Sequence, residues 1–128
     1  MENDRTAMIT IGGDEHALVL TTRATKEISK RYGGLENLGD KLLQSDDFTL
    51  AIDEVVWLVT LLANQSVQVH NLRHPKDARP LLTEEAVELL TSPADLAKCK
   101  SAIMEAMYRG TARHIESEDN SGKNVQAG

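Results

Sequence analysis

Two short apolar runs stand at the start of the chain. Ala7-Met8-Ile9-Thr10-Ile11 and His16-Ala17-Leu18-Val19-Leu20 are separated by Gly12-Gly13-Asp14-Glu15. Glycines adopt the positive φ that tight hairpin turns require, so this pattern predicts an N-terminal β-hairpin. A lone hairpin is marginally stable in water, and we therefore expect it to rest on the other elements. The side chains expected to face inward are Ile9, Ile11, Leu18 and Leu20.

Helical spacing begins after the hairpin. Thr22 is the expected N-cap of a first helix, and Gly33-Gly34 is its expected end. Its apolar positions, four residues apart, are Ala24, Ile28 and Tyr32. A second short helix is predicted next, with one apolar face made of Leu35, Leu38 and Leu42. Gly39 lies inside that helix and weakens it by about 1 kcal/mol relative to alanine.

The most informative segment is a predicted helix from Phe48 to Asn64. Ser45-Asp46-Asp47 precedes it and supplies side chains that suit the N-terminal end of a helix. A core-facing stripe repeats at alternating spacings of four and three: Phe48, Ile52, Val55, Val59 and Leu62. A second apolar stripe, Leu50, Trp57 and Leu61, lies roughly 160° away if each residue turns by about 100°. Such a helix is buried on both sides or meets another chain, so Leu50, Trp57 and Leu61 form the candidate interaction surface.

The last part of the chain predicts two more helices and a tail. Residues 65–69 fit either a continued helix or a short extended piece, and residues 70–80, with two prolines, predict a loop. Thr83 begins a short helix whose apolar members are Val87, Leu89 and Leu90. Ser92-Pro93-Ala94-Asp95 is a strong start for another, which places Leu96, Cys99, Ile103 and Met107 on one face. This helix is expected to end near Gly110 or to fray out to about Ile115.

The expected fold is a small, mainly α single domain. It comprises residues 1–115, with about five helices and the N-terminal β-hairpin, followed by a disordered polar tail of residues 116–128. The tail has almost no apolar surface to offset the entropy lost on ordering.

Composition narrows the function. The chain has 128 residues, 14 Lys and Arg against 20 Asp and Glu, and a formal charge of −6, which argues against a nucleic-acid binder that needs a basic face. The run from Val55 to Ala63 is too short to span a bilayer. The opening residues Met1-Glu2-Asn3-Asp4 do not read as a secretory signal. With a single cysteine and no predicted disulfide, we expect a soluble, cytoplasmic protein.

Candidate chemistry is sparse. His70 and His74 stand four residues apart, but Pro75 disfavours helical geometry there, so a metal site is not predicted. Cys99 could be a nucleophile with a histidine as its base, yet it falls on an apolar helix face, where a buried cysteine is inert. Neither glycine pair matches a phosphate-loop pattern. No enzyme activity and no cofactor is expected.

One basic cluster interrupts the acidic composition. Arg73, Lys76 and Arg79 fall within the predicted loop, where they could contact an acidic partner or phosphate. A solvated loop is the simpler interpretation of these residues.

The segment from Leu18 to Leu38 resembles the tail assembly chaperones of long-tailed bacteriophages. It has a short strand, a helix ending at Tyr32-Gly33-Gly34, and then a leucine-bearing helix. The order of elements continues to match through the apolar helix of residues 48–63 and the later start Leu81-Leu82-Thr83-Glu84-Glu85. The resemblance covers roughly residues 8–110.

The resemblance implies a non-enzymatic role in the host-cell cytoplasm. Such chaperones bind the long helical tape-measure protein, keep it soluble and give way as tail-tube subunits assemble around it. The implied partners are the tape-measure protein and the tail-tube protein, and we also expect self-association. The alternatives are a small helical DNA-binding regulator, with residues 83–90 and 93–110 as a helix-turn-helix, and a minor head–tail structural component of the virion.

Overall fold

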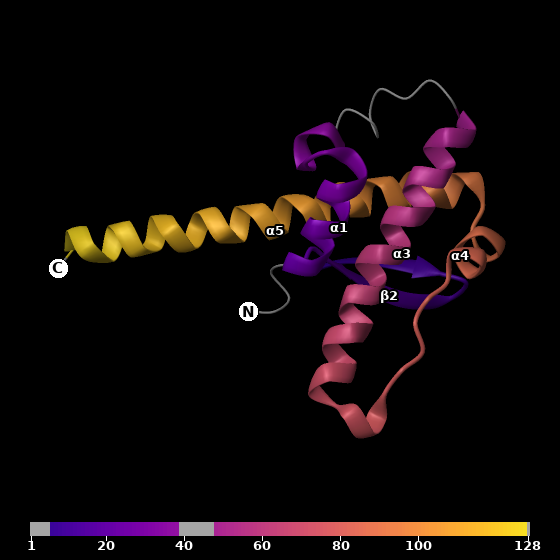
Figure 1. Ribbon diagram of the computed structural model, residues 1–128, viewed down its shortest axis with the longest axis horizontal. Coiled ribbons are helices and arrows are strands. Elements are labelled where there is room, and N and C mark those ends of the chain that lie inside the picture. The colour runs from indigo at the N-terminus through magenta and orange to yellow at the C-terminus, as the bar shows by residue number, and fades with distance from the viewer. Residues whose placement is uncertain (1–5, 39–47, 128) are drawn as a thin grey trace.

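The fold consists of a two-stranded hairpin that packs one face against two long helices. The computed structural model describes the backbone of residues 6–38 and 48–127 and the side chains of residues 6–38 and 51–111. Helix α3 (Phe48–Arg73) lies against strand β2, helix α5 (Pro93–Ala127) lies against strand β1, and the two helices cross (Figure 1). The shorter helices α1 (Thr22–Tyr32) and α4 (Glu84–Leu90) both pack on α3. The predicted mainly α domain with an N-terminal hairpin is confirmed.

The hairpin forms as the sequence predicts. Strand β1 (Thr6–Ile11) pairs antiparallel with β2 (Asp14–Val19), and Thr6 stands opposite Val19 at the open end. Gly12 and Gly13 form the two-residue turn with φ of 60° and 89°, the positive values that such a turn requires. Three of the four side chains expected inside are buried, namely Ile9, Ile11 and Leu18, and Leu20 is partly buried.

Helix α1 begins one residue earlier than predicted. Thr21, not Thr22, is the N-cap, and its hydroxyl accepts a hydrogen bond from the amide of Ala24 at 3.0 Å. At the other end Gly33 adopts the left-handed conformation, with φ of 81°, and its N–H donates to the carbonyl of Ser29. The predicted inward positions are all buried: Ala24, Ile28 and Tyr32.

The second short helix lies only partly within the described residues. Residues 35–38 are helical, and Leu38 is fully buried. The remaining positions named for this helix, Gly39 and Leu42, and the predicted cap Ser45-Asp46-Asp47 lie outside the described residues.

Helix α3 is the centre of the fold and is longer than predicted. The undecided residues 65–69 are helical, and the loop predicted for residues 70–73 is wrong. Helical hydrogen bonding persists to the amide of His74, which donates to the carbonyl of His70 at 2.8 Å. His74 itself, with φ of −131° and ψ of 67°, leaves the helix because Pro75 follows it. Pro75 therefore ends α3 at Arg73, two residues before the proline.

The core forms around the middle of α3. Its buried residues there lie within an arc of about 160° on one side of the helix: Val55, Val56, Leu58, Val59, Leu62 and Ala63. Ile52 is partly buried against the same cluster.

Among the residues that the structure describes, no helix is both long and apolar enough to cross a membrane.

The starts of α4 and α5 follow the sequence signals. Thr83 caps α4 by accepting a hydrogen bond from the amide of Ala86 at 3.0 Å. Ser92 and Asp95 form a reciprocal capping box at the start of α5, with N···O distances of 2.9 Å and 3.3 Å. The backbone N–H of Ser92, and then its hydroxyl, hold the pKa of Asp95 below its usual value.

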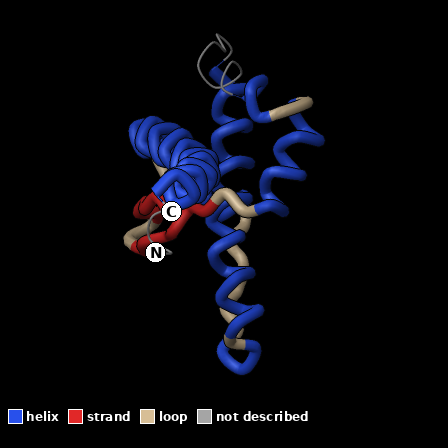
Figure 2. Tube along the Cα trace, turned by 90° about the vertical axis from the view of Figure 1, so that its left-hand side faces the viewer, coloured by secondary structure: helices blue, strands red, loops and turns tan. Residues whose placement is uncertain are grey.

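The expected end of α5 near Gly110 or Ile115 is wrong, because the helix continues to Ala127 and projects away from the hairpin (Figures 1 and 2). Gly110 instead allows close packing, since a Cβ there would lie 2.9 Å from the Cβ of Leu20. The predicted apolar face is correct, with Cys99, Ile103 and Met107 buried and Leu96 partly buried. The division into a domain of residues 1–115 and a polar tail of residues 116–128 stays a prediction.

Candidate functional site

The predicted interaction surface is largely covered by the chain itself. Trp57 and Leu61 are partly buried and pack against the core, whereas the side chain of Leu50 lies outside the described residues. At Trp57 and Leu61 the surface of Leu50, Trp57 and Leu61 is therefore not fully exposed to solvent. Its role in binding a client or a second copy stays a prediction.

Trp57 is covered by the last turn of α1. The guanidinium carbon of Arg31 lies 4.3 Å from the centre of a Trp57 ring, a cation–π contact of about 0.5–1 kcal/mol at an exposed site. The ring of Tyr32 meets Trp57 edge-on, at a centroid distance of 6.1 Å and an interplanar angle of 71°. Such aromatic pairs contribute about 0.5–1.5 kcal/mol beyond the area that they bury.

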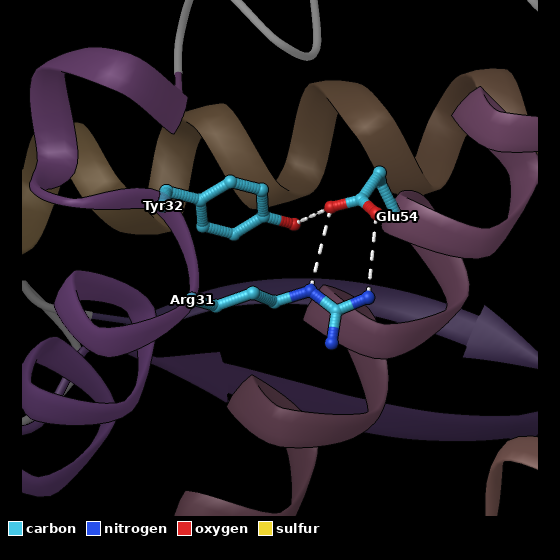
Figure 3. A network of polar contacts seen from close by, with 3 residues as sticks. All are labelled: Arg31, Tyr32 and Glu54. Carbon is cyan, nitrogen blue, oxygen red and sulfur yellow. Dashed lines mark hydrogen bonds and ion pairs between the residues drawn. The ribbon is translucent and has the colours of Figure 1, made fainter.

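Glu54 fixes both covering residues in place (Figure 3). The hydroxyl of Tyr32 donates to Oε1 of Glu54, and Arg31 donates from Nε and Nη2 at 3.4 Å and 3.3 Å. Burial, and then the hydrogen bond to Glu54, raises the pKa of Tyr32 well above its usual value. The phenol therefore stays protonated at neutral pH and donates a hydrogen bond to Glu54. This bond links α1 to α3.

We expect Glu54→Ala to destabilise the protein by about 1–2 kcal/mol, because it leaves a partly buried phenol without its acceptor. Trp57 is the single tryptophan of the chain, so its emission spectrum reports on this site, and we expect the emission to shift to longer wavelength. Urea denaturation followed by fluorescence measures both effects. Glu27→Ala is the control, because Glu27 makes only an exposed ion pair with Lys30 at 3.9 Å. Equal stability and an unchanged spectrum in Glu54→Ala would contradict the role of Glu54.

A more open apolar surface lies where the hairpin turn meets α4. Met8 and Leu90 share a cavity there and are 55% and 54% exposed. The neighbouring Leu89 of α4 is 76% exposed. We call these three residues the hairpin–α4 face. A cavity of about 650 Å³ adjoins it, lined by Met8 and Leu90 together with the charged side chains of Glu15, Asp95 and Lys98. Gly12 keeps the turn close to α4, since a Cβ there would lie 3.0 Å from Cδ1 of Leu90.

The sequence analysis grouped Val87, Leu89 and Leu90 as the apolar residues of one helix, although they do not all lie on one side of it. Within α4 only Val87 is buried. Leu89 follows Val87 by two residues, which places it about 200° around the helix on the opposite side. Leu89 is accordingly exposed on the side of α4 away from the core.

Cys99 is fully buried, and burial, then the charge of Asp95, raises its pKa to about 11, so the thiol is protonated at neutral pH and is a poor nucleophile. The rings of His70 and His74 lie 4.8 Å apart. Among the described side chains, no group of three or more His, Cys, Asp and Glu could hold a metal ion. That the protein is not an enzyme and needs no cofactor stays a prediction.

Comparison with known protein families, with curated proteins and with solved structures finds no match to this chain. The resemblance to tail assembly chaperones therefore depends on the residues of this sequence, in the segment from Leu18 to Leu38 above all.

Proposed function

We propose that this protein is a tail assembly chaperone of a long-tailed bacteriophage. In the cytoplasm of the infected host cell it binds the tape-measure protein, keeps it soluble during assembly, and gives way as tail-tube subunits assemble. The proposal draws on the resemblance of residues 18–38 and on the order of elements, a hairpin followed by helices.

The observation that carries the proposal is the hairpin–α4 face. Met8 and Leu90 line the same cavity, the neighbouring Leu89 follows on α4, and each is more than half exposed. A contiguous exposed apolar patch on a small domain marks an interaction site. An amphipathic helix binds such a surface with apolar residues spaced three and four apart. Charged side chains at the rim of the adjoining cavity, Glu15, Asp95 and Lys98, would contact the polar sides of that helix.

Co-expression with the large helical protein encoded downstream in the same gene cluster tests the proposal. We expect this protein to bind that client and to increase its soluble fraction, and Leu89→Asp to reduce recovery of the complex about tenfold, since a charge would face the client's apolar side. Leu72→Asp is the control, because Leu72 is 83% exposed near the far end of α3. Equal recovery with both variants would reject the hairpin–α4 face. If co-expression changed neither solubility nor recovery, the chaperone proposal would be rejected.

Trp57 distinguishes the two candidate surfaces. A client peptide without tryptophan should leave the emission of Trp57 unchanged if it binds the hairpin–α4 face. A changed emission would indicate binding at Leu50, Trp57 and Leu61. We propose that latter surface for self-association, which a concentration series in size-exclusion chromatography measures.

The alternative functions give different results in the same system. A DNA-binding regulator using α4 and α5 would shift a DNA probe at physiological salt, although Glu84, Glu85 and Glu88 on α4 oppose contact with phosphate. A structural component would be found in purified particles, whereas an assembly chaperone leaves no copy there.

A further inference from the structure

Strand β1 has a free edge. Among the residues that the structure describes, the sheet consists of β1 and β2 alone. Ile11 and Asp14 close the two-residue turn as a hydrogen-bonded pair. Such pairs alternate along an antiparallel ladder, so the N–H and C=O groups of Met8 and Thr10 point away from β2. Within the described part of the chain, these four groups have no hydrogen-bond partner.

This edge lacks the features that usually protect an edge strand. Charged side chains, prolines and bulges commonly prevent another strand from pairing with an exposed edge. The six residues of β1 include no charged residue and no proline, and they pair one to one with β2 without a bulge. Strand β2, in contrast, begins with Asp14 and Glu15. Strand addition is therefore expected at β1 rather than at β2.

The cavity beside the hairpin–α4 face runs along this edge. Residues 8–10 of β1 all line it. Successive side chains of a strand point to opposite faces, so three residues in a row border one space along the edge of a strand and not on one face. One residue of a strand occupies about 160 Å³ at the usual strand and sheet spacings, so a cavity of about 650 Å³ holds about four residues of extended chain.

We propose that the free edge of β1 binds an extended segment of a partner polypeptide as a third, antiparallel strand. Four main-chain hydrogen bonds form, two with Met8 and two with Thr10, and antiparallel pairing is the more stable arrangement. Main-chain bonding of this kind accepts many sequences, and the side chains beside the edge determine which are preferred.

The charges around the cavity favour a strand with basic side chains. Two carboxylates line it, those of Glu15 and Asp95, and one ammonium group, that of Lys98. Glu15 stands opposite Thr10 and on the same face of the hairpin. A residue added opposite Thr10 lies two strand spacings, about 10 Å, from Glu15, and a long lysine or arginine side chain reaches toward that carboxylate. The proposed segment therefore carries lysine or arginine at this position.

A second copy of the chain is a less suitable occupant of this edge. Its own α4 and α5 lie beside its β1, as Leu90 and Lys98 do here, and they would have to enter the same gap. The proposal is also independent of the client helix proposed above, because it concerns the main chain of β1. A bound strand and that helix would share the cavity, so we expect each to exclude the other.

A blocked eight-residue peptide of alternating lysine and valine tests the edge, with amide NMR of the full chain at neutral pH and physiological salt. We expect the peptide to shift the amides of Met8 and Thr10 and to slow their hydrogen exchange. N-methylation of the lysine amides, which face β1 in this register, should weaken binding at least tenfold because it removes the donors. N-methylation of the valine amides is the matched control, since these face away from β1, and less than about a twofold change is expected.

Two proline variants make the same comparison on the protein. Thr10→Pro removes an N–H that points away from β2, and proline is tolerated at such an edge position. We expect it to weaken binding of the unmodified peptide about tenfold. Ala17→Pro is the control, because the N–H of Ala17 points outward from the opposite edge. Glu15→Gln should weaken binding about threefold, as expected for one exposed ion pair.

The proposal is overturned by any of the following results. Equal weakening by the two methylated peptides, or by the two proline variants, would show that the main chain of β1 is not the binding group. Shifts confined to β2 would assign binding to the other edge. Shifts at Met8 and Thr10 that depend on protein concentration without peptide would assign the edge to a second copy. If Thr10→Pro failed to fold, the methylated peptides would decide the matter on the wild-type chain. Co-expression with the client tests the chaperone proposal separately, so failure of one does not imply failure of the other.

Discussion

Replacing Val59 with aspartate is expected to unfold the protein at room temperature. Val59 is fully buried in the cluster shared by the hairpin, α3 and α5. A carboxylate there would lose its hydration without gaining a partner, or would have to take up a proton. Either route costs several kcal/mol, comparable with the total of about 5–15 kcal/mol that stabilises a typical domain.

Circular dichroism and urea denaturation measure this effect. Leu72→Asp is the control, because it places the same charge on the same helix at a position that is 83% exposed. We expect its stability to stay within about 0.5 kcal/mol of the wild type. A cooperative melt of Val59→Asp at the wild-type temperature would show that the core is not where the structure places it.

The parts of the fold that could be predicted are those with local signals. Gly12-Gly13 specifies a turn, Thr83 can bond the amide of Ala86, and Ser92 with Asp95 forms a capping box. Each signal acts over at most four residues, so no tertiary information is needed to recognise it. The apolar stripe through Val55 and Val59 likewise predicted the centre of the core.

The length of α3 could not be predicted in the same way. Residues 65–73 carry polar and β-branched side chains without a clear helical stripe. Several of their partners lie far away in sequence: Gln65 accepts a hydrogen bond from Thr21, and Asn71 bonds the backbone of Arg79. The first contact requires α1 to lie against α3. The second requires residues 79–82, which we call the return segment, to lie along α3.

The candidate site shows a similar division. The second stripe of α3 predicted that Trp57 is covered by this chain or by another one. Arg31 and Tyr32 of α1 supply part of that cover, and an arginine on an aromatic ring leaves no hydrophobic pattern to recognise. The cluster of Arg73, Lys76 and Arg79 was visible in the sequence, but the pocket that Arg73 and Arg79 both line depends on the fold.

Two asparagines hold the return segment to α3. Asn64 accepts from the N–H of Leu82 at 2.7 Å and donates to its carbonyl at 2.8 Å, and Asn71 makes the same pair of bonds with Arg79. The seven steps from Asn64 to Asn71, about two turns of helix, rise about 10 Å. The three steps of extended chain from Arg79 to Leu82 span about the same length. The two pairs therefore form together without strain in either segment.

Asn64→Ala is accordingly expected to destabilise the protein by about 2 kcal/mol, because it leaves the partly buried N–H and carbonyl of Leu82 without partners. Asn64→Asp should fall between this variant and the wild type, since a carboxylate still accepts from the N–H but cannot donate to the carbonyl. Asn71→Ala should cost about 1 kcal/mol or less, because its bonds to Arg79 are exposed and water can replace them. Urea denaturation measures all three, and hydrogen exchange at the amide of Leu82 locates the change, with faster exchange expected in Asn64→Ala. A larger loss of stability in Asn71→Ala than in Asn64→Ala would contradict this expectation. It would show that the exposed bonds of Asn71, and not the partly buried bonds of Asn64, hold the return segment to α3.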